Sequence, residues 1–251
     1  MIPTAESWFG RMLRWPLRFV PAMTPMRIRS GPLAGNQWLS TAATHGCWIG
    51  TYERELQLLM TQLVHPGQVM YDVGANVGFF TLLGSHLVGP SGKVIAFEPL
   101  PRNVELLRRH IAMNSLDNVT VVAAAVGDTA GTALFNVSPS PSMGRLGSTG
   151  ELSVEVTTLD LLVGRGEVPP PALIKMDIEG GESRALAGAA QTLARFRPVL
   201  LLSTHGAEQN DLCWKAMEQL GYSVHMRRDG RVDGQYELVA MPGTAQALSN
   251  A

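Results

Sequence analysis

Short apolar runs alternate with helical segments through most of the chain, and no other feature of the sequence limits the fold as strongly. The runs are short and mostly apolar, without strict alternation of apolar and polar residues, which is typical of strands buried on both faces of a parallel sheet. They cover residues 69–73, 93–97, 119–125, 173–178 and 198–203. Helical spacing of apolar residues predicts helices over residues 51–63, 79–87, 102–114, 159–163, 182–194 and 211–220. Because parallel strands need right-handed crossovers, the sequence predicts an α/β fold with a Rossmann-like, doubly wound sheet.

Further strand pairs are expected around turn-rich connectors. They are a hairpin at 26–30 and 36–41, a pair at 132–137 and 153–157 around a mobile Ser/Pro/Gly loop at 138–145, and a closing pair at 223–226 and 236–241. No break divides the α/β part. We therefore expect a basic N-terminal arm with the hairpin at 1–45, one domain at 46–243 and a flexible tail at 244–251.

The charge distribution limits the partners of the chain. A formal net charge of −1 argues against a general nucleic-acid binder, which needs a broadly positive surface. Residues 1–30 hold five arginines and one glutamate. This basic, amphipathic arm predicts a terminal helix that docks on its own domain or a partner, or that contacts a membrane peripherally. With two cysteines and no apolar run of about 20 residues, we expect a cytoplasmic protein.

The most informative segment is DVGANVG at residues 72–78, which follows a predicted strand and opens a helix. Ligands of open α/β sheets bind beyond the carboxyl ends of the strands, where glycines let the backbone approach a nucleotide. Gly74, Asn76 and Gly78 do not give the G-x-G-x-x-G spacing of a dinucleotide site. Asn76 tolerates left-handed backbone angles, and Asp72 could pair with the α-amino group of S-adenosylmethionine (SAM). These residues favour SAM over a nicotinamide cofactor.

A second carboxylate, Glu98, ends the next predicted strand. An acidic side chain there can accept hydrogen bonds from both hydroxyls of a ribose, a role that serves NAD and SAM alike. After the third strand, small residues including Ala125 and Val126 leave room for an adenine ring. Small residues also simply pack, so the two carboxylates around the glycine turn carry the prediction of a cofactor site.

Several motifs, taken in order, resemble the FkbM-type SAM-dependent methyltransferases: WIGTYE at 48–53, DVGANVGFFT at 72–81, FEP at 97–99, TLD at 158–160 and KMDIEGGE at 175–182. The resemblance implies a class I methyltransferase fold, a seven-stranded sheet whose last strand is antiparallel. It also implies methyl transfer from SAM to a hydroxyl of a sugar, glycan or secondary metabolite, with S-adenosylhomocysteine (SAH) as product. The predicted cofactor-binding residues are Tyr52, Glu53, Asp72, Gly74, Asn76, Gly78, Phe79, Glu98, Pro99, Asn103, Ala125, Val126 and Asp177.

Three residues are predicted to be catalytic: Asp177, His205 and Lys175. Methyl transfer to oxygen requires alignment of the reacting atoms and loss of the hydroxyl proton. Asp177 ends the fourth strand of the α/β alternation, and Lys175 shares its face. His205 is the favoured general base because its pKa is nearest neutrality, and Asp177 would orient it or take the proton itself. In the structural alternative, Asp177 and Glu179 cap the following helix and pair with Lys175.

The segment after the fifth of these strands departs from the family pattern. It reads Ser203-Thr204-His205, so the histidine is kept, but the acidic residue that many members carry two positions earlier is absent. Without an Asp-Asn pair there, we expect no metal requirement. The DIEG segment at 177–180 also lacks the signature of amine-directed nucleic-acid methyltransferases. A small hydroxylated acceptor is favoured, and a nicotinamide-dependent oxidoreductase or a non-catalytic SAM-binding module are the alternatives. Oligomeric state stays open.

Overall fold

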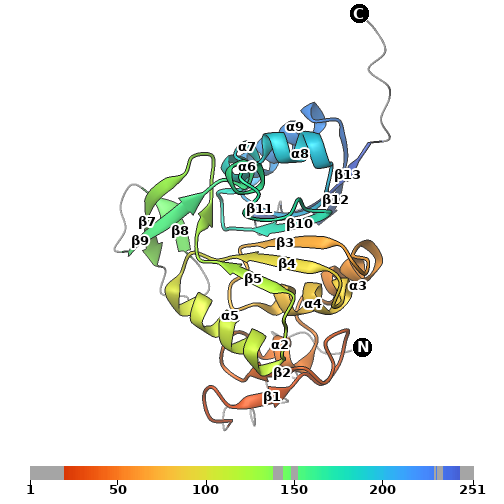
Figure 1. Cartoon of the computed structure of the whole chain (residues 1–251), viewed down its shortest axis with the longest axis vertical. Coiled ribbons are helices and arrows are strands. Elements are labelled where there is room, and N and C mark those ends of the chain that lie inside the picture. The colour runs from red at the N-terminus through yellow and green to blue at the C-terminus, as the bar shows by residue number, and fades with distance from the viewer. Residues whose placement is uncertain (1–19, 138–143, 148–151, 229, 231–233, 244–251) are drawn as a thin grey trace, which may run out of the picture.

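A seven-stranded sheet forms the centre of the computed structural model, which describes residues 20–137, 144–147, 152–228, 230 and 234–243 (Figure 1). The strand order is β12-β13-β11-β10-β3-β4-β5. β11, β10, β3, β4 and β5 are mutually parallel, whereas β13 is antiparallel to both of its neighbours. The predicted doubly wound fold with an antiparallel last strand is therefore confirmed. The strands are β3 (Val69–Val73), β4 (Lys93–Phe97), β5 (Val119–Val122), β10 (Leu173–Asp177), β11 (Val199–His205), β12 (Tyr222–Arg228) and β13 (Gln235–Pro242).

Helices cover both faces of this sheet (Figure 1). One layer holds α2 (His45–Ile49), α3 (Arg54–Leu63), α4 (Phe79–Val88) and α5 (Pro101–Met113). The other holds α6 (Leu159–Gly164), α7 (Glu182–Ala187), α8 (Ala190–Phe196) and α9 (Ala207–Gln219). Because successive side chains of a strand point to opposite faces, Met70 packs into the first layer and Tyr71 into the second. This is why the strands read as mostly apolar runs.

A second, four-stranded sheet, in the order β6-β9-β7-β8, corrects two boundaries of the prediction. Its strands are β6 (Ala125–Val126), β7 (Gly131–Val137), β8 (Gly144–Gly147) and β9 (Leu152–Thr157). The strand predicted over 119–125 ends at Val122, because Ala125 and Val126 pair with β9 instead. Gly144 and Arg145, predicted to lie in a mobile loop, belong to β8, whose backbone pairs with β7. The rest of that loop lies outside the described residues.

The single helix predicted over 182–194 is wrong, because two helices, α7 and α8, meet at Gly188 and Ala189. A Cβ at Gly188 would lie 2.0 Å from the backbone oxygen of Gly127, so this glycine permits a close contact between two chain segments. The carboxylate of Asp160 then accepts hydrogen bonds from the backbone N–H groups of Gln191 and Thr192, at 3.0 and 2.7 Å. A remote side chain therefore caps α8 and stabilises the break.

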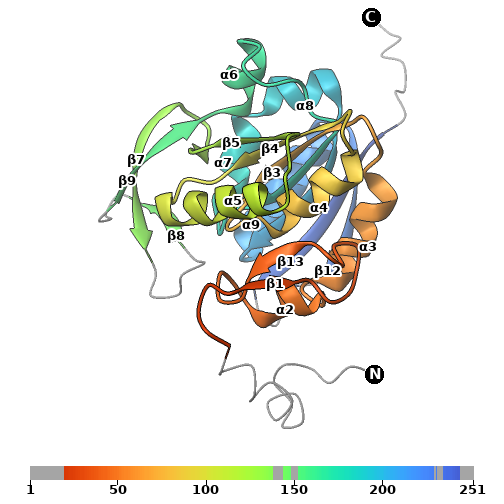
Figure 2. The ribbon, with the colours of Figure 1, turned by 60° about the horizontal axis from the view of Figure 1, so that its bottom comes forward.

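The hairpin of β1 (Pro25–Arg27) and β2 (Gln37–Leu39) packs beside α4 and α5, where Figure 2 shows it together with α2. Trp38 stacks on His110 of α5 with ring centroids 4.0 Å apart. The Leu39 N–H donates to Nε2 of His110 at 3.1 Å, so Nδ1 carries the proton and donates to the Val77 carbonyl at 2.7 Å. His110 therefore links the hairpin to the loop that follows β3.

The arm at 1–19 and the tail at 244–251, each the subject of a prediction, lie outside the described residues. Among the helices in the described part of the chain, none has the length and apolar character needed to cross a membrane.

The neutral state of His110 makes stability depend on pH. Burial lowers the pKa of His110 from 6.5 to about 4. Above pH 6.5 neither the folded nor the unfolded chain binds a second proton at His110. Between pH 6.5 and 4 the unfolded chain binds it and the folded chain does not. The free energy of unfolding should therefore fall by up to about 3 kcal/mol over that window. Urea unfolding at pH 7.5 and 4.5 should show a smaller pH effect in His110→Gln than in the wild type, and equal pH effects would refute this role.

Candidate functional site

The carboxyl ends of β3, β4, β10 and β11 border one cavity of about 1080 Å³. Most of the predicted site residues line it: Tyr52, Gly74, Asn76, Gly78, Phe79, Glu98, Pro99, Asn103, Ala125, Val126, Lys175, Asp177 and His205. Asp72 and Glu53 do not line it. The strand ends thus bring together residues that lie more than 150 positions apart in the sequence. This edge of an open α/β sheet is where such sheets bind their ligands.

The loop at 74–78 forms one wall of this cavity and has a left-handed backbone at three positions. The φ angles are 81° at Gly74, 50° at Asn76 and 99° at Gly78, so Asn76 adopts the conformation expected of it. The N–H groups of Gly74 and Ala75 donate to the Phe97 carbonyl at 3.0 and 2.9 Å, which fixes the loop to the end of β4. The loop therefore presents backbone to the cavity in one defined shape.

Gly74 also permits a close approach to β10, and this gives a testable prediction. A Cβ at this position would lie 1.9 Å from the backbone oxygen of Asp177, and a left-handed backbone costs other residues about 1–2 kcal/mol. Gly74→Ala should therefore lose at least about 2 kcal/mol of unfolding free energy and bind SAH more weakly. Gly166→Ala is the control, since Gly166 shares a positive φ but has open space around it. Denaturant unfolding measures both variants. Equal losses of unfolding free energy in the two would show that the close approach of Gly74 to β10 does not contribute to stability.

Glu98 is buried at the end of β4 and organises the loops around it. Its Oε1 accepts hydrogen bonds from the N–H of Leu100 at 2.9 Å and from Nδ2 of Asn103 at 3.3 Å, and its Oε2 accepts from the N–H of Asn76 at 2.8 Å. Burial raises the pKa of this carboxyl, and the three donors oppose that shift. Within the described part of the chain, Oε2 accepts one hydrogen bond, so it keeps acceptor capacity toward the cavity.

Lys175 connects two of the predicted site carboxylates. Its Nζ lies 3.7 Å from Oδ1 of Asp72 and 3.8 Å from Oδ2 of Asp177, and 5.1 Å from the ring centroid of Phe80. Asp72 is fully buried, and its Oδ2 accepts a hydrogen bond from the Thr81 hydroxyl at 2.6 Å. Burial by itself lowers the pKa of Lys175, but the neighbouring carboxylates more than offset it and raise that pKa. Lys175 is therefore a buried cation that holds Asp177 at the cavity wall.

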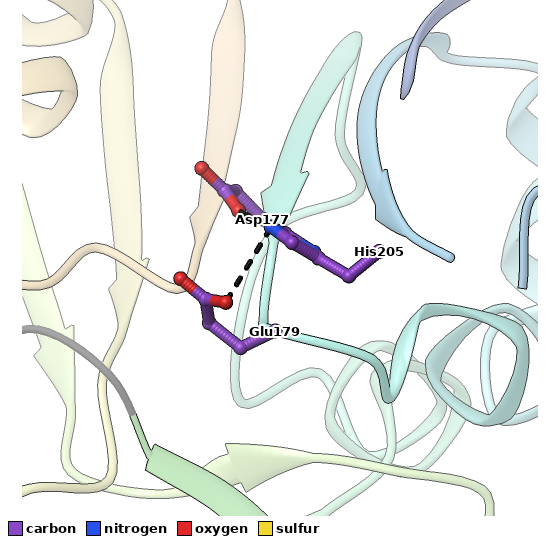
Figure 3. Close-up of side chains that lie close together, drawn as sticks. All are labelled: Asp177, Glu179 and His205. Carbon is purple, nitrogen blue, oxygen red and sulfur yellow. Dashed lines mark ion pairs between the residues drawn. The ribbon is translucent and has the colours of Figure 1, made fainter. Parts of the chain in front are cut away.

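Asp177, Glu179 and His205 converge where β10 and β11 end, and Figure 3 shows their side chains pointing toward one another. Nε2 of His205 lies 3.8 Å from Oδ1 of Asp177 and 3.5 Å from Oε2 of Glu179. Nδ1 lies 3.0 Å from Oε1 of Glu182, which is fully buried. Burial by itself lowers the pKa of His205, but the three carboxylates raise it above its ordinary value. The structure thus brings together the predicted pair of Asp177 and His205.

Tyr52 and Glu53 lie just before α3 and differ in their access to the cavity. Tyr52 lines it and packs edge-on against Phe79, with ring centroids 5.2 Å apart. Burial raises the pKa of Tyr52, so its hydroxyl stays protonated. Glu53 has a left-handed backbone, with φ 42°, and its carboxylate interacts electrostatically with Lys175. Tyr52 is thus placed to contact a ligand, whereas Glu53 adds to the acidic surroundings of Lys175.

Sequence reasoning missed three parts of this cavity. The segment at 41–44 lines it, but nothing in its composition distinguishes it from an ordinary connector. Arg184 stands at its edge, paired with Asp128 at 2.8 Å. The sequence prediction gives Glu179 a structural role, as a helix cap that pairs with Lys175, although its place two residues after a strand-ending aspartate also suits a second ligand-facing acid. Its backbone is left-handed, with φ 59°.

Comparison with known proteins agrees with this geometry. Residues 72–224 match the family model described as the methyltransferase FkbM domain. The Haloferax volcanii protein named hexuronic acid methyltransferase AglP is 26% identical over 162 residues, which cover 64% of this chain and 66% of that protein. The Streptomyces tacrolimicus protein named 31-O-demethyl-FK506 methyltransferase FkbM is 28% identical over 163 residues, covering 50% of this chain and 60% of that protein. The alignments thus span less than two thirds of either relative.

A solved structure agrees at the level of the fold. The crystal structure of a methyltransferase FkbM from Methylobacillus flagellatus superposes with a TM-score of 0.50 at 18% identity. The match covers 78% of this chain and 53% of that one.

Proposed function

The chain belongs to the FkbM methyltransferase family, and we propose that it is a SAM-dependent O-methyltransferase whose acceptor is a hydroxyl of a sugar or another small polyhydroxylated molecule. The observation that carries this proposal is the meeting of two groups of residues in one cavity. The glycine loop and Glu98 form one wall, and Asp177 with His205 forms another. A site for a nucleoside-like donor therefore adjoins groups that can act on a hydroxyl.

The residues present fit SAM by their chemistry. The cavity is lined by the carboxylates of Glu98, Asp177, Glu179 and Glu208 and by fewer basic groups, which suits a ligand that carries a positively charged sulfonium. Glu98 keeps acceptor capacity at Oε2 for a ribose hydroxyl. The left-handed loop at 74–78 exposes backbone, and the small residues at 124–127 leave room for a flat ring. Asp72 does not line the cavity but pairs with Lys175, which does, so we propose that it supports the site through that lysine.

The proposed reaction depends mainly on how the site positions the acceptor hydroxyl relative to the methyl donor. SAM, when bound, supplies an electrophilic methyl group, which an acceptor oxygen must approach in line with the sulfur. Asp177 and His205 are placed to receive the acceptor hydroxyl and to promote loss of its proton. Lys175 fixes one oxygen of Asp177 at 3.8 Å, and Glu182 fixes the ring of His205 at 3.0 Å. The aromatic side chains of Tyr52 and Phe79 form an apolar wall that limits access of water.

The acceptor class is supported by the names of the relatives. One is named a hexuronic acid methyltransferase, and the name of the other describes methylation at an oxygen. A sugar presents vicinal hydroxyls, which can donate hydrogen bonds to carboxylates such as those of Asp177 and Glu179. The nicotinamide-dependent oxidoreductase that we considered from the sequence is set aside, because the family is one of methyltransferases.

Isothermal titration of the full chain with SAH and, separately, with NAD tests the cofactor part of the proposal. Saturable binding of SAH with no binding of NAD is expected. Binding of NAD without SAH would reverse the assignment. SAH binding without methyl transfer to any hydroxylated acceptor would favour the non-catalytic binding module.

A further inference from the structure

A set of possible metal ligands stands at the acceptor end of the cavity. Asp177, Glu179 and His205 each offer one ligand atom, and these atoms all lie within 4.8 Å of one another. All three residues line the cavity and are partly buried. They come from two adjacent strand ends, because Glu179 follows β10 and His205 closes β11. The arrangement (Figure 3) is therefore set by the sheet and not by one loop alone.

The spacing of these atoms suits a shared cation better than direct hydrogen bonds. Nε2 of His205 lies 3.5 Å from the Glu179 oxygen and 3.8 Å from the Asp177 oxygen, which exceeds the usual length of an N–H···O bond. At metal–ligand bonds of about 2.0–2.3 Å, adjacent ligand atoms lie about 3 Å apart and opposite ones a little over 4 Å. The observed separations fall in that range.

A fourth residue, outside the cluster, orients the imidazole as metal sites require. Glu182 is fully buried, and its Oε1 lies 3.0 Å from Nδ1 of His205 and also accepts the Gly180 N–H at 2.9 Å. Its Oε2 is a buried atom without a hydrogen-bond partner among the described residues. A carboxylate that accepts a hydrogen bond from one ring nitrogen fixes the tautomer and leaves the other nitrogen as a ligand. With Nδ1 held by Glu182, Nε2 of His205 is the ring nitrogen that faces the two carboxylates and that would bind a cation.

The carboxylates around His205 also favour the binding of a cation. Three carboxylates, those of Asp177, Glu179 and Glu182, surround one imidazole. The cation that pairs with Asp177, Lys175, is shared between Asp177 and Asp72. Buried or half-buried charges are stable when they are paired or bind a metal. A divalent cation bound here would therefore be stabilised by several carboxylates at once.

We propose that Asp177, Glu179 and His205 bind a divalent cation of the Mn²⁺ or Mg²⁺ class, with Glu182 as the residue that positions His205. Two carboxylates and one imidazole suit such a cation and leave coordination positions open toward the cavity. The inference rests on the proposed function, in which the open positions receive the acceptor hydroxyl. Coordination lowers the pKa of that hydroxyl, so its proton passes to solvent before the oxygen is methylated. Asp177 and His205 then promote proton loss through the cation.

Titration of the chelator-treated full chain with Mn²⁺, followed by electron paramagnetic resonance of the free ion, tests the site. Saturable binding near one equivalent is expected, and Mg²⁺ should compete for it. Glu179→Gln and His205→Ala should each weaken binding by at least about tenfold. Glu105→Gln is the matched control, because Glu105 is exposed on α5 and lies outside both the cavity and the cluster. Thermal melts establish that each variant is folded.

Two results would overturn the cation site. One is Mn²⁺ binding that does not saturate or that Glu179→Gln leaves unchanged. The other is methyl transfer at an undiminished rate in the presence of a chelator, which would leave the O-methyltransferase proposal standing. Saturable, Glu179-dependent Mn²⁺ binding by a protein that binds no SAH would instead support the site and contradict the proposed function.

Discussion

Replacing Lys175 by methionine should lower the free energy of unfolding by about 3–5 kcal/mol, because removing one partner of a buried ion pair leaves an uncompensated charge. Asp72 is fully buried, and Lys175 lies 3.7 Å from it. Methionine has a similar volume and would keep the contact with Phe80, so the loss isolates the charge. For a chain of this size, a change of 1 kcal/mol shifts the melting temperature by about 2–4 °C, so a drop of roughly 10 °C is expected.

Urea unfolding of the wild type and three variants checks this result. Lys93→Met is the control, because Lys93 is exposed at the start of β4, and it should stay within about 0.5 kcal/mol of the wild type. Adding Asp72→Asn to Lys175→Met should recover part of the loss, since the variant then no longer buries that unpaired carboxylate. A Lys175→Met protein as stable as Lys93→Met, or a double variant weaker than the single one, would refute the buried ion pair.

Replacing Glu98 by glutamine should weaken SAH binding by roughly 10- to 100-fold, because a hydrogen bond from a ribose hydroxyl to a charged acceptor contributes about 1.5–3 kcal/mol. Glutamine keeps the volume, but its amide NH₂ would face the N–H of either Asn76 or Leu100, which now donate to opposite carboxylate oxygens. The shape of the glycine loop therefore suffers together with the direct contact.

Calorimetric titration with SAH measures this effect. Glu105→Gln serves as the matched control, since Glu105 lies exposed on α5 and should bind SAH as the wild type does. If Glu98→Gln stays folded and its affinity for SAH lies within about threefold of that of the wild type, a difference under 1 kcal/mol, then Glu98 does not bind the ribose.

The sequence was sufficient for the parts of the fold that depend on local pattern. β3 and β4 match the prediction residue for residue, because each is a mostly apolar run bounded by turn or glycine signals. The break between α7 and α8 could not be predicted, since it depends on Gly188 meeting Gly127 and on a cap from Asp160. These partners are remote in sequence and are brought together only by tertiary packing.

The same distinction applies to the site. Gly74 and Glu98 could be placed because they end strands, and strand ends of an open sheet share one edge. The pairing of Asp72 with Lys175 needed the strand order, in which β10 lies beside β3 with these two residues in register. The expectation of no metal requirement rested on the residues after β11 alone. The set formed with Glu179 depends on the pairing of β10 with β11 and on the conformation of the loop after β10, which strand pattern does not determine.

The most direct test of the central claim is to incubate the full chain with SAM that carries a labelled methyl group and a panel of hydroxylated acceptors that includes a hexuronic acid. The proposed function predicts label recovered on an acceptor oxygen as a methyl ether, with one SAH formed for each methyl transferred. Label recovered on nitrogen, or no label on any hydroxylated acceptor, would contradict it.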